Sequence, residues 1–261
     1  MRRKQLIELT DIPWWPATFK CLLTDFLHLY TVLIRPFSPK LNLIRTAIGR
    51  SSTNAVVDLC AGSGGPWPEL LQDLNIESAA IGSVTLTDLN PNPEAAERLN
   101  RDEGIGYYPT PVDARNVPLE LKGCRTIFDG FHHFPPAEAR KILQDAVNQG
   151  EPIVIFEILR RTIPDLMPML FAFVHVWLLT PLIRPFSWRR LFFTYALPIA
   201  PIAIAFDGSV SILRCYSPDE LMQMAKSTEG AQNYEWHAGD YKKWGMFPVT
   251  YLVGMPKVET H

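Results

Sequence analysis

The sequence predicts an α/β protein built on a doubly wound, mostly parallel sheet of seven strands. Short apolar runs of strand length alternate with helix-length segments from residue 53 to residue 160, and a glycine-rich turn follows the first run. This alternation is typical of parallel sheets, in which each crossover helix packs on a face of the sheet. Two strand-length runs near the C-terminus bring the number to seven. An apolar N-terminal helix and a hydrophobic helical insertion after the fifth strand complete the predicted fold class.

The first strand and its turn occupy residues 53–71. The strand is predicted from a short, partly β-branched apolar run that contains one carboxylate, Ala55-Val56-Val57-Asp58-Leu59. Such a run suits a strand that is covered on both faces. The turn allows positive φ and close backbone approach at Gly62, Gly64 and Gly65. Pro66 or Pro68 can then occupy a first helical turn, where a missing N–H costs nothing.

The remaining strands follow in order along the chain. We expect them over residues 84–88, 107–113, 125–129 and 152–157, with helices over 94–101 and 137–148. After the insertion, a capping serine, a proline and two acids predict a helix that starts at Ser217-Pro218-Asp219-Glu220. The last two strands are expected over residues 234–237 and 247–254.

The turn resembles motif I of the class I S-adenosylmethionine (SAM)-dependent methyltransferases, in which an acid precedes a small-residue G-x-G turn. The residues that carry the resemblance are Asp58-Leu59-Cys60-Ala61-Gly62-Ser63-Gly64, with Cys60 where the commonest form has glycine. No Gly-Lys-Ser/Thr sequence of the Walker type follows, so phosphate binding is not indicated. The order of strands, insertion, helix and closing strand pair is also similar to this family, over roughly residues 40–160 and 216–256.

The resemblance implies SAM as cofactor and assigns residues to its binding. These are Asp58, Cys60, Ala61, Gly62, Gly64, Asp88, Leu89, Asp113, Ala114 and Phe131. Asp88, at the end of the second strand, is expected to bind both ribose hydroxyls through its two oxygens. Asp113 and Ala114 stand where related enzymes contact the adenine amino group. For Asp88 an ordinary turn aspartate stays an alternative, and for Asp113 a solvated loop acid.

Candidate catalytic residues follow the fourth and fifth strands. Methyl transfer from a sulfonium requires alignment of the acceptor, and a hydroxyl or acidic carbon acceptor also requires a base. His132 and His133 are the first candidates because imidazole titrates near neutrality, and Glu157 and Asp129 are weaker ones. Alternatively, one histidine packs or caps while the other binds cofactor through its backbone. We interpret His175, inside an apolar helix, as a packed core residue, and the alternative is a side chain directed into a substrate tunnel.

The composition limits the classes of partner. Hydrophobic residues make up 47% of the 261 residues and the formal net charge is -2, which lacks the basic character of a nucleic-acid binder. A lipidic or small-molecule partner fits better. The four cysteines are scattered without a C-x-x-C pair, which argues against a metal site and a disulfide framework and favours a reducing cytoplasm. The apolar stretch after Arg2-Arg3-Lys4 is too short for a secretion signal.

Two segments are unusually apolar. A helix is predicted over residues 17–34, ended by Arg35-Pro36, and a shorter one over 39–49. Between residues 163 and 207, the stretches 166–183 and 191–206 carry no charged residue. The insertion is interpreted as lying in a membrane interface, as capping an apolar active site or as a buried helical subdomain. A spanning hairpin is the fourth alternative, although its runs are short and the second contains Pro198 and Pro201.

The hexapeptide Leu-Ile-Arg-Pro-Phe-Ser occurs at residues 33–38 and again at 182–187. Its repetition suggests that the N-terminal helix and the insertion share one environment. We therefore predict an N-terminal helical cap over residues 1–50, a SAM-binding core over 51–162 and 208–261, and the insertion over 163–207.

The functional hypothesis is a SAM-dependent methyltransferase for a small hydrophobic or lipid-like acceptor, with a membrane surface considered as its place of action. Two alternatives stay open: a non-catalytic, membrane-associated SAM-binding protein, and a SAM-dependent enzyme of other chemistry. The sequence does not predict the oligomeric state.

Overall fold

A computed structural model describes residues 1–261 except 77–80, 101–103, 243–246 and 259–261. The chain divides into two compact units. The first, which we call the helical unit, combines Met1–Arg35 with Leu159–Tyr216. The second, the sheet unit, combines Pro36–Ile158 with Ser217–His261.

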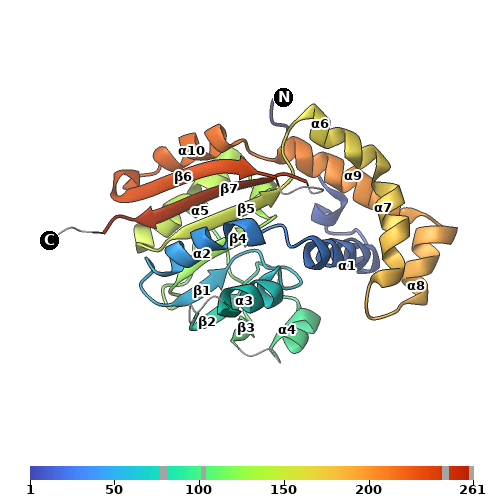
Figure 1. Ribbon diagram of the computed structural model, residues 1–261, viewed down its shortest axis with the longest axis horizontal. Helices are drawn as coiled ribbons and strands as arrows, with labels where there is room; N and C mark the ends of the chain where they lie inside the picture. The colour runs from blue at the N-terminus through green and yellow to red at the C-terminus, as the bar shows by residue number, and fades with distance from the viewer. Residues whose placement is uncertain (77–80, 101–103, 243–246, 259–261) are drawn as a thin grey trace. The chain divides into compact units, whose positions relative to one another are not determined.

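The sheet unit contains a seven-stranded sheet with the order β3-β2-β1-β4-β5-β7-β6 (Figure 1). All neighbouring strands from β3 to β5 are parallel, whereas β7 runs antiparallel to both β5 and β6. This confirms the predicted doubly wound, mostly parallel sheet. The strands are β1 (Ala55–Asp58), β2 (Ser83–Leu86), β3 (Ile105–Tyr107), β4 (Cys124–Phe128), β5 (Ile153–Ile158), β6 (Tyr234–Tyr241) and β7 (Val249–Pro256).

Helices cover both faces of this sheet. A buried cluster joins alternate strand residues such as Val56 and Val154 to side chains of α2 (Leu41–Ile48), α3 (Trp67–Ile76) and α4 (Pro93–Leu99). The opposite face carries α5 (Pro136–Gln149) and α10 (Pro218–Lys226), because the buried Arg125 of β4 forms an ion pair with Asp145 of α5 and because α10 contacts α5, β6 and β7. Three short 3₁₀ turns connect these elements: η2 (Ser38–Lys40), η3 (Phe131–His133) and η7 (Ala231–Asn233).

The predicted start of α10 is confirmed in detail. The Ser217 hydroxyl accepts the Glu220 N–H at 3.3 Å, and the Glu220 carboxylate accepts the Ser217 N–H at 2.8 Å. This reciprocal pair is a capping box, which satisfies two backbone donors at the helix start.

The predicted third strand is corrected. It was expected over residues 107–113, but β3 ends at Tyr107. Pro109 and Pro111 follow within four residues, and proline cannot donate to a strand ladder. Asp113 consequently lies in a loop. The sixth strand extends beyond the predicted residues 234–237 because it pairs with β7 as far as Tyr241. The predicted helix end at Arg101 lies outside the described residues.

The helical unit is built from α1 (Ala17–Ile34) and the insertion. The insertion contains α6 (Ile163–Leu166), η4 (Met167–Phe171), α7 (Ala172–Leu179), η5 (Thr180–Leu182), α8 (Trp188–Leu191), one π-helical turn η6 (Phe192–Ala196) and α9 (Ile199–Arg214), and the N-terminal segment adds η1 (Leu9–Asp11). Within this unit α9 contacts both α1 and α7. The buried Arg190 of α8 forms an ion pair with Asp25 of α1 at 2.5 Å. The N-terminal helix and the insertion therefore share one environment, as the repeated hexapeptide suggests.

The unit boundaries differ from the predicted ones. Residues 36–50 belong to the sheet unit rather than to an N-terminal cap, because α2 buries Ile44 and Ala47 in its core. The insertion starts at Leu159 and continues to Tyr216 instead of ending at 207. It does so because Asp207 of α9 accepts the backbone N–H groups of Leu9 and Thr10, which holds the end of the helix to the N-terminal segment.

Helix lengths in the described ranges bear on the membrane alternatives. There α1 is the one single helix long and apolar enough to cross a membrane by length and composition. Two further candidates are pairs of helices bent by 47° and 76°, and the second bend lies at Pro198. His175, expected in a packed core, is exposed instead, because α7 buries Ala172 and Val176.

Candidate functional site

The turn after β1 lies where the strand order of the sheet reverses. From β1 the chain continues outward through β2 to β3 and then returns to β4 on the other side of β1. At such a switch point the loops after two neighbouring parallel strands diverge, and ligands of open α/β sheets bind there. Next to the strand ends the loops after β1 and β4 are still close together, since a Cβ built on Gly130, after β4, would lie 3.2 Å from the Cβ of Cys60.

The backbone of this turn is left-handed at four positions. The φ angles are 59° at Cys60, 53° at Gly62, 120° at Gly64 and 58° at Gly65. Hydrogen bonds fix the turn, with the Ala61 N–H donating to the Thr87 carbonyl at 2.9 Å. Gly62 is exposed, and no heavy atom lies within 4 Å of the position that its Cβ would occupy. The turn therefore offers bare backbone to a ligand.

Asp88 holds the turn from the neighbouring strand. One carboxylate oxygen accepts the Gly62 N–H at 2.9 Å, and the other accepts the Asn90 N–H at 2.8 Å. The Tyr107 hydroxyl donates to the Gly62 carbonyl at 2.9 Å. Each carboxylate oxygen can accept a second hydrogen bond, so the half-buried Asp88 retains capacity for a ligand. The next residue, Leu89, is 54% exposed.

Asp58 supports the turn from below. It is 1% exposed and accepts a hydrogen bond from the Thr126 hydroxyl of β4 at 2.5 Å. Burial raises the pKa of its carboxyl group to about 7, an effect that the Thr126 hydrogen bond opposes. Because its carboxylate is buried, Asp58 connects β1 to β4 and positions the turn.

The loop with Asp113 and Ala114 is tied to the same edge. The Val112 N–H donates to the Asp88 carbonyl at 2.9 Å, and Ala114 is buried. Asp113 accepts hydrogen bonds from the Arg115 guanidinium at 2.8, 3.1 and 2.6 Å, which lower the pKa of this acid. Arg115 also pairs with Glu138 of α5. An adenine contact by Asp113 therefore has to be shared with Arg115, a residue that sequence reasoning missed although it stands two positions after an acid.

His132 and Glu157 form a buried pair at the ends of β4 and β5. The Glu157 carboxylate is hydrogen-bonded to the Nδ1 of His132, and it accepts the N–H groups of Phe131 at 2.6 Å and His132 at 3.2 Å. Both ionisable side chains are buried, and Phe131 is fully buried, so Phe131 is not exposed for the cofactor contact that the resemblance implies. A proton on Nδ1 directed at the carboxylate leaves the lone pair of neutral imidazole on Nε2, the arrangement of a general base.

Two further candidates flank this pair. The His133 ring lies 4.4 Å from that of His132, centroid to centroid. Asp129 has a φ of 52° and accepts the Ile158 N–H. Burial, reinforced by the nearby charge of Glu157, raises the pKa of Asp129 to about 7. The structure thus brings together all four residues that the sequence named as possible bases.

Cys60, another residue assigned to cofactor binding, lies in the turn itself. Burial raises the pKa of the Cys60 thiol, which keeps it protonated.

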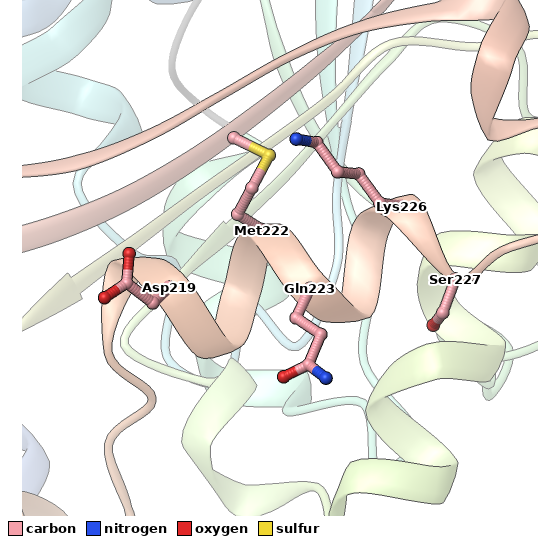
Figure 2. A pocket seen from close by; sticks show the side chains of 5 residues that line it. All are labelled: Asp219, Met222, Gln223, Lys226 and Ser227. Atoms are coloured by element: carbon pink, nitrogen blue, oxygen red, sulfur yellow. The ribbon is translucent and has the colours of Figure 1, made fainter.

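Apart from this site, a depression on α10 is lined by Asp219, Met222, Gln223, Lys226 and Ser227 (Figure 2). Since α10 packs against β6 and β7, several strands from β1, we do not assign this depression to the site.

Comparisons with known proteins give structural matches alone. No family model and no curated protein matches the sequence. The trans-methyltransferase CalH in complex with SAH aligns with 96% of this chain at a TM-score of 0.51 and 13% identity, and this chain covers 62% of CalH. For the plantazolicin methyltransferase BpumL in complex with SAH, the TM-score is 0.47 at 11% identity, over 92% of this chain and 98% of that one. For human N-acetylserotonin methyltransferase in complex with SAM, the TM-score is 0.49 at 13% identity, over 92% of this chain and 57% of that one.

The strand order and the alignment with CalH agree. This chain has five parallel strands in the order β3-β2-β1-β4-β5, extended by an antiparallel pair, and it aligns with CalH over 96% of its length. This chain therefore has the fold of the class I SAM-dependent methyltransferases.

Proposed function

We propose that this protein is a SAM-dependent methyltransferase whose acceptor is a small hydrophobic or lipid-like molecule. The observation that carries the proposal is the exposed Gly62 backbone, bound to Asp88 at the switch point of the sheet. A nucleoside needs bare backbone for close approach, a carboxylate for its ribose hydroxyls and an apolar surface for its base. Gly62, Asp88 and the exposed Leu89 supply these three features within one loop region.

SAM supplies an electrophilic methyl group when bound, and the chain's own residues must orient and deprotonate the acceptor. We assign the proton transfer to His132, with Glu157 holding its ring and stabilising the imidazolium that forms. Because Glu157 accepts two backbone N–H groups as well, the ring is fixed relative to the end of β4. An acceptor with a hydroxyl group or an acidic carbon suits this arrangement.

The hydrophobic acceptor is supported by the composition of the helical unit. Large apolar side chains are exposed along its insertion, among them Leu178 at 70% and Trp188 at 78%. Surfaces of this kind bind apolar partners. We propose that the helical unit recognises the acceptor and that the sheet unit binds the donor.

Calorimetry with SAM and with S-adenosylhomocysteine tests the donor site. We expect wild-type protein to bind both and Asp88→Asn to bind about 10- to 100-fold more weakly, because hydrogen bonds to a charged acceptor are lost. Asp219→Asn, an exposed acid on α10, is the matched control and should bind like wild type. Absence of heat with wild-type protein, or equal affinities of all three proteins, would contradict the proposal.

Transfer is tested separately with methyl-labelled SAM and a lipid extract. We expect label in the organic phase and S-adenosylhomocysteine as the other product. Donor binding without incorporation would instead identify a non-catalytic SAM-binding protein, and consumption of SAM without S-adenosylhomocysteine would identify other chemistry.

A further inference from the structure

Exposed apolar side chains are concentrated in the helical unit. Of the 24 large hydrophobic residues that are exposed in the described part of the chain, 21 belong to this unit, and the other three are Leu89, Leu119 and Val258. Soluble proteins commonly expose such residues singly, and a concentration of them marks an interaction surface. We call the exposed residues of segment 163–206 the insertion surface.

The exposed charges of the insertion surface have one sign. The charged residues of segment 163–206 are Asp165, Arg184, Arg189 and Arg190, of which Asp165 and Arg190 are buried. Asp165 accepts a hydrogen bond from Arg160 at 3.2 Å, and Arg190 is paired with Asp25. Only Arg184 and Arg189 remain exposed among the charged residues that the structure describes in this segment. An apolar surface with exposed cations and no exposed acid is complementary to anionic lipid.

Aromatic rings connect the insertion to the start of α1. Ring centroids lie 6.4 Å apart for Trp14 and Trp15, 5.4 Å for Trp15 and Phe19, and 5.1 Å for Phe19 and Phe193. The outer ring of this series, Trp14, is 77% exposed. Farther along the insertion, the rings of the exposed Phe186 and Trp188 lie 5.1 Å apart. Aromatic side chains gather at the level of lipid headgroups, because they combine an apolar body with a polar or polarisable edge.

Single helices of the insertion are too short to cross a bilayer. At 1.5 Å per residue, α7 and α9 extend about 12 and 24 Å, whereas the hydrocarbon core is about 30 Å thick. The two apolar helix pairs of the insertion are bent by 47° and 76°. The end of α9 is polar, since Arg214 forms ion pairs with Asp11 at 2.5 Å and with Glu8 at 3.3 Å. These features favour helices that lie in one leaflet.

We propose that the insertion surface, together with Trp14, enters one leaflet of an anionic bilayer, with Arg184 and Arg189 at the headgroups. The apolar side chains provide the insertion and the two guanidinium groups provide the preference for anionic lipid. This inference does not rest on donor binding, so it stands or fails apart from the proposed function.

Co-sedimentation of the full-length protein with vesicles tests the proposal. We expect binding to vesicles that contain phosphatidylglycerol, and about 10- to 30-fold weaker binding to phosphatidylcholine alone, because each cation near an anionic surface contributes separately. The double variant Arg184→Gln/Arg189→Gln should lose this preference. Wild-type protein that stays in the supernatant with both vesicles overturns the proposal.

A matched pair of variants locates the surface. Trp188→Ser should weaken vesicle binding about tenfold or more, since a large exposed aromatic anchor is lost. Leu119→Ser removes a side chain of the sheet unit that is 72% exposed, and it should bind like wild type. Equal effects of the two substitutions would show that binding does not depend on the insertion surface.

The same proteins are used to measure how deeply the insertion surface enters the bilayer and whether a second copy of the chain binds it instead. Lipids brominated near the headgroup should quench tryptophan fluorescence more than lipids brominated near the chain ends, and Trp188→Phe should reduce that quenching. Stronger quenching by the deep bromines would overturn the one-leaflet arrangement. Light scattering measures whether the protein is a dimer. A wild-type dimer that does not bind vesicles and that Trp188→Ser dissociates would overturn the proposal and assign the surface to a second copy of the chain.

Discussion

Gly62 and Gly150 provide a matched test of the turn after β1. Both have left-handed φ angles, 53° and 70°, and at neither is there a heavy atom within 4 Å of the position of an added Cβ. Gly62 lies in the turn at the carboxyl end of β1, whereas Gly150 ends α5 and precedes β5 at the opposite edge of the sheet. Substitution by alanine at either position strains the backbone without causing a clash.

The expected stability change is the same for both substitutions. An alanine in the left-handed region costs about 1 kcal/mol, which lowers the melting temperature by about 2 to 4 °C for a chain of this size. The Gly62 N–H is kept, so its hydrogen bond to Asp88 survives. The added methyl group, however, occupies the bare backbone on which a nucleoside would lie. We therefore expect Gly62→Ala to lose about tenfold or more in affinity for S-adenosylhomocysteine, as one misplaced group in a tight site does, and Gly150→Ala to bind like wild type.

Thermal unfolding and titration calorimetry on the same preparations separate the two effects. Equal losses of melting temperature with a selective loss of affinity at Gly62 support the assignment. Wild-type affinity in both variants would refute it, because a ligand that tolerates a methyl group there does not touch the turn. A much larger fall in melting temperature for Gly62→Ala would show that the substitution unfolds the turn, and the affinity comparison would then be made at Asp88.

Four further substitutions test the site and the interior of the sheet unit. Glu157→Gln removes the charge that holds the His132 ring, so it should lower the rate of methyl transfer by up to about 10²- to 10⁴-fold, the usual contribution of a general base, with donor affinity unchanged; full activity would show that Glu157 does not act through His132. Because burial raises the pKa of Asp58 to about 7, the folded protein keeps a proton that the unfolded chain releases above about pH 4, so this contribution to stability is complete below about pH 4 and is lost as the pH rises to 7. Urea unfolding of Asp58→Asn against wild type should show that difference, up to about 4 kcal/mol, and parallel pH profiles would contradict it. Asp145→Asn should cost about 3 to 5 kcal/mol in urea, because it leaves the buried Arg125 without its anion, whereas Arg125→Met should cost less.

The elements that sequence patterns predict best are those with local causes. The turn after β1 was predicted because glycines, an acid and an apolar run stand within a dozen residues, and α10 because its capping box is contained in four. The interaction of His132 with Glu157 depends instead on β4 and β5 being neighbours in the sheet. The sequence named both residues but treated them as competing candidates. Their pairing becomes visible only when the topology places two parallel strand ends side by side.

The boundary of the insertion shows a second kind of limit. Apolar composition ends at residue 206, and the predicted segment ended one residue later. The helix nevertheless continues to Arg214. Its last turns are held by Asp207, Ser211 and Arg214, which contact the N-terminal segment 8–11. Composition reports the environment of a segment, whereas its membership of a unit is decided by contacts. Contacts across about 200 residues leave no local signal.

Cys60 is where the turn departs from the commonest form of its motif, and the structure explains both the preference for glycine and the exception. Its φ of 59° lies in the left-handed region, where a residue with a side chain costs about 1 to 2 kcal/mol more than glycine does. The Cys60 side chain is directed at Gly130 in the loop after β4, and a side chain at Gly130 would approach it to 3.2 Å. The first loop has Cys60 where the motif commonly has glycine, and the second loop has Gly130 at the position that faces it. Since burial keeps the thiol neutral, Cys60 fills the space between the two loops with a small uncharged group.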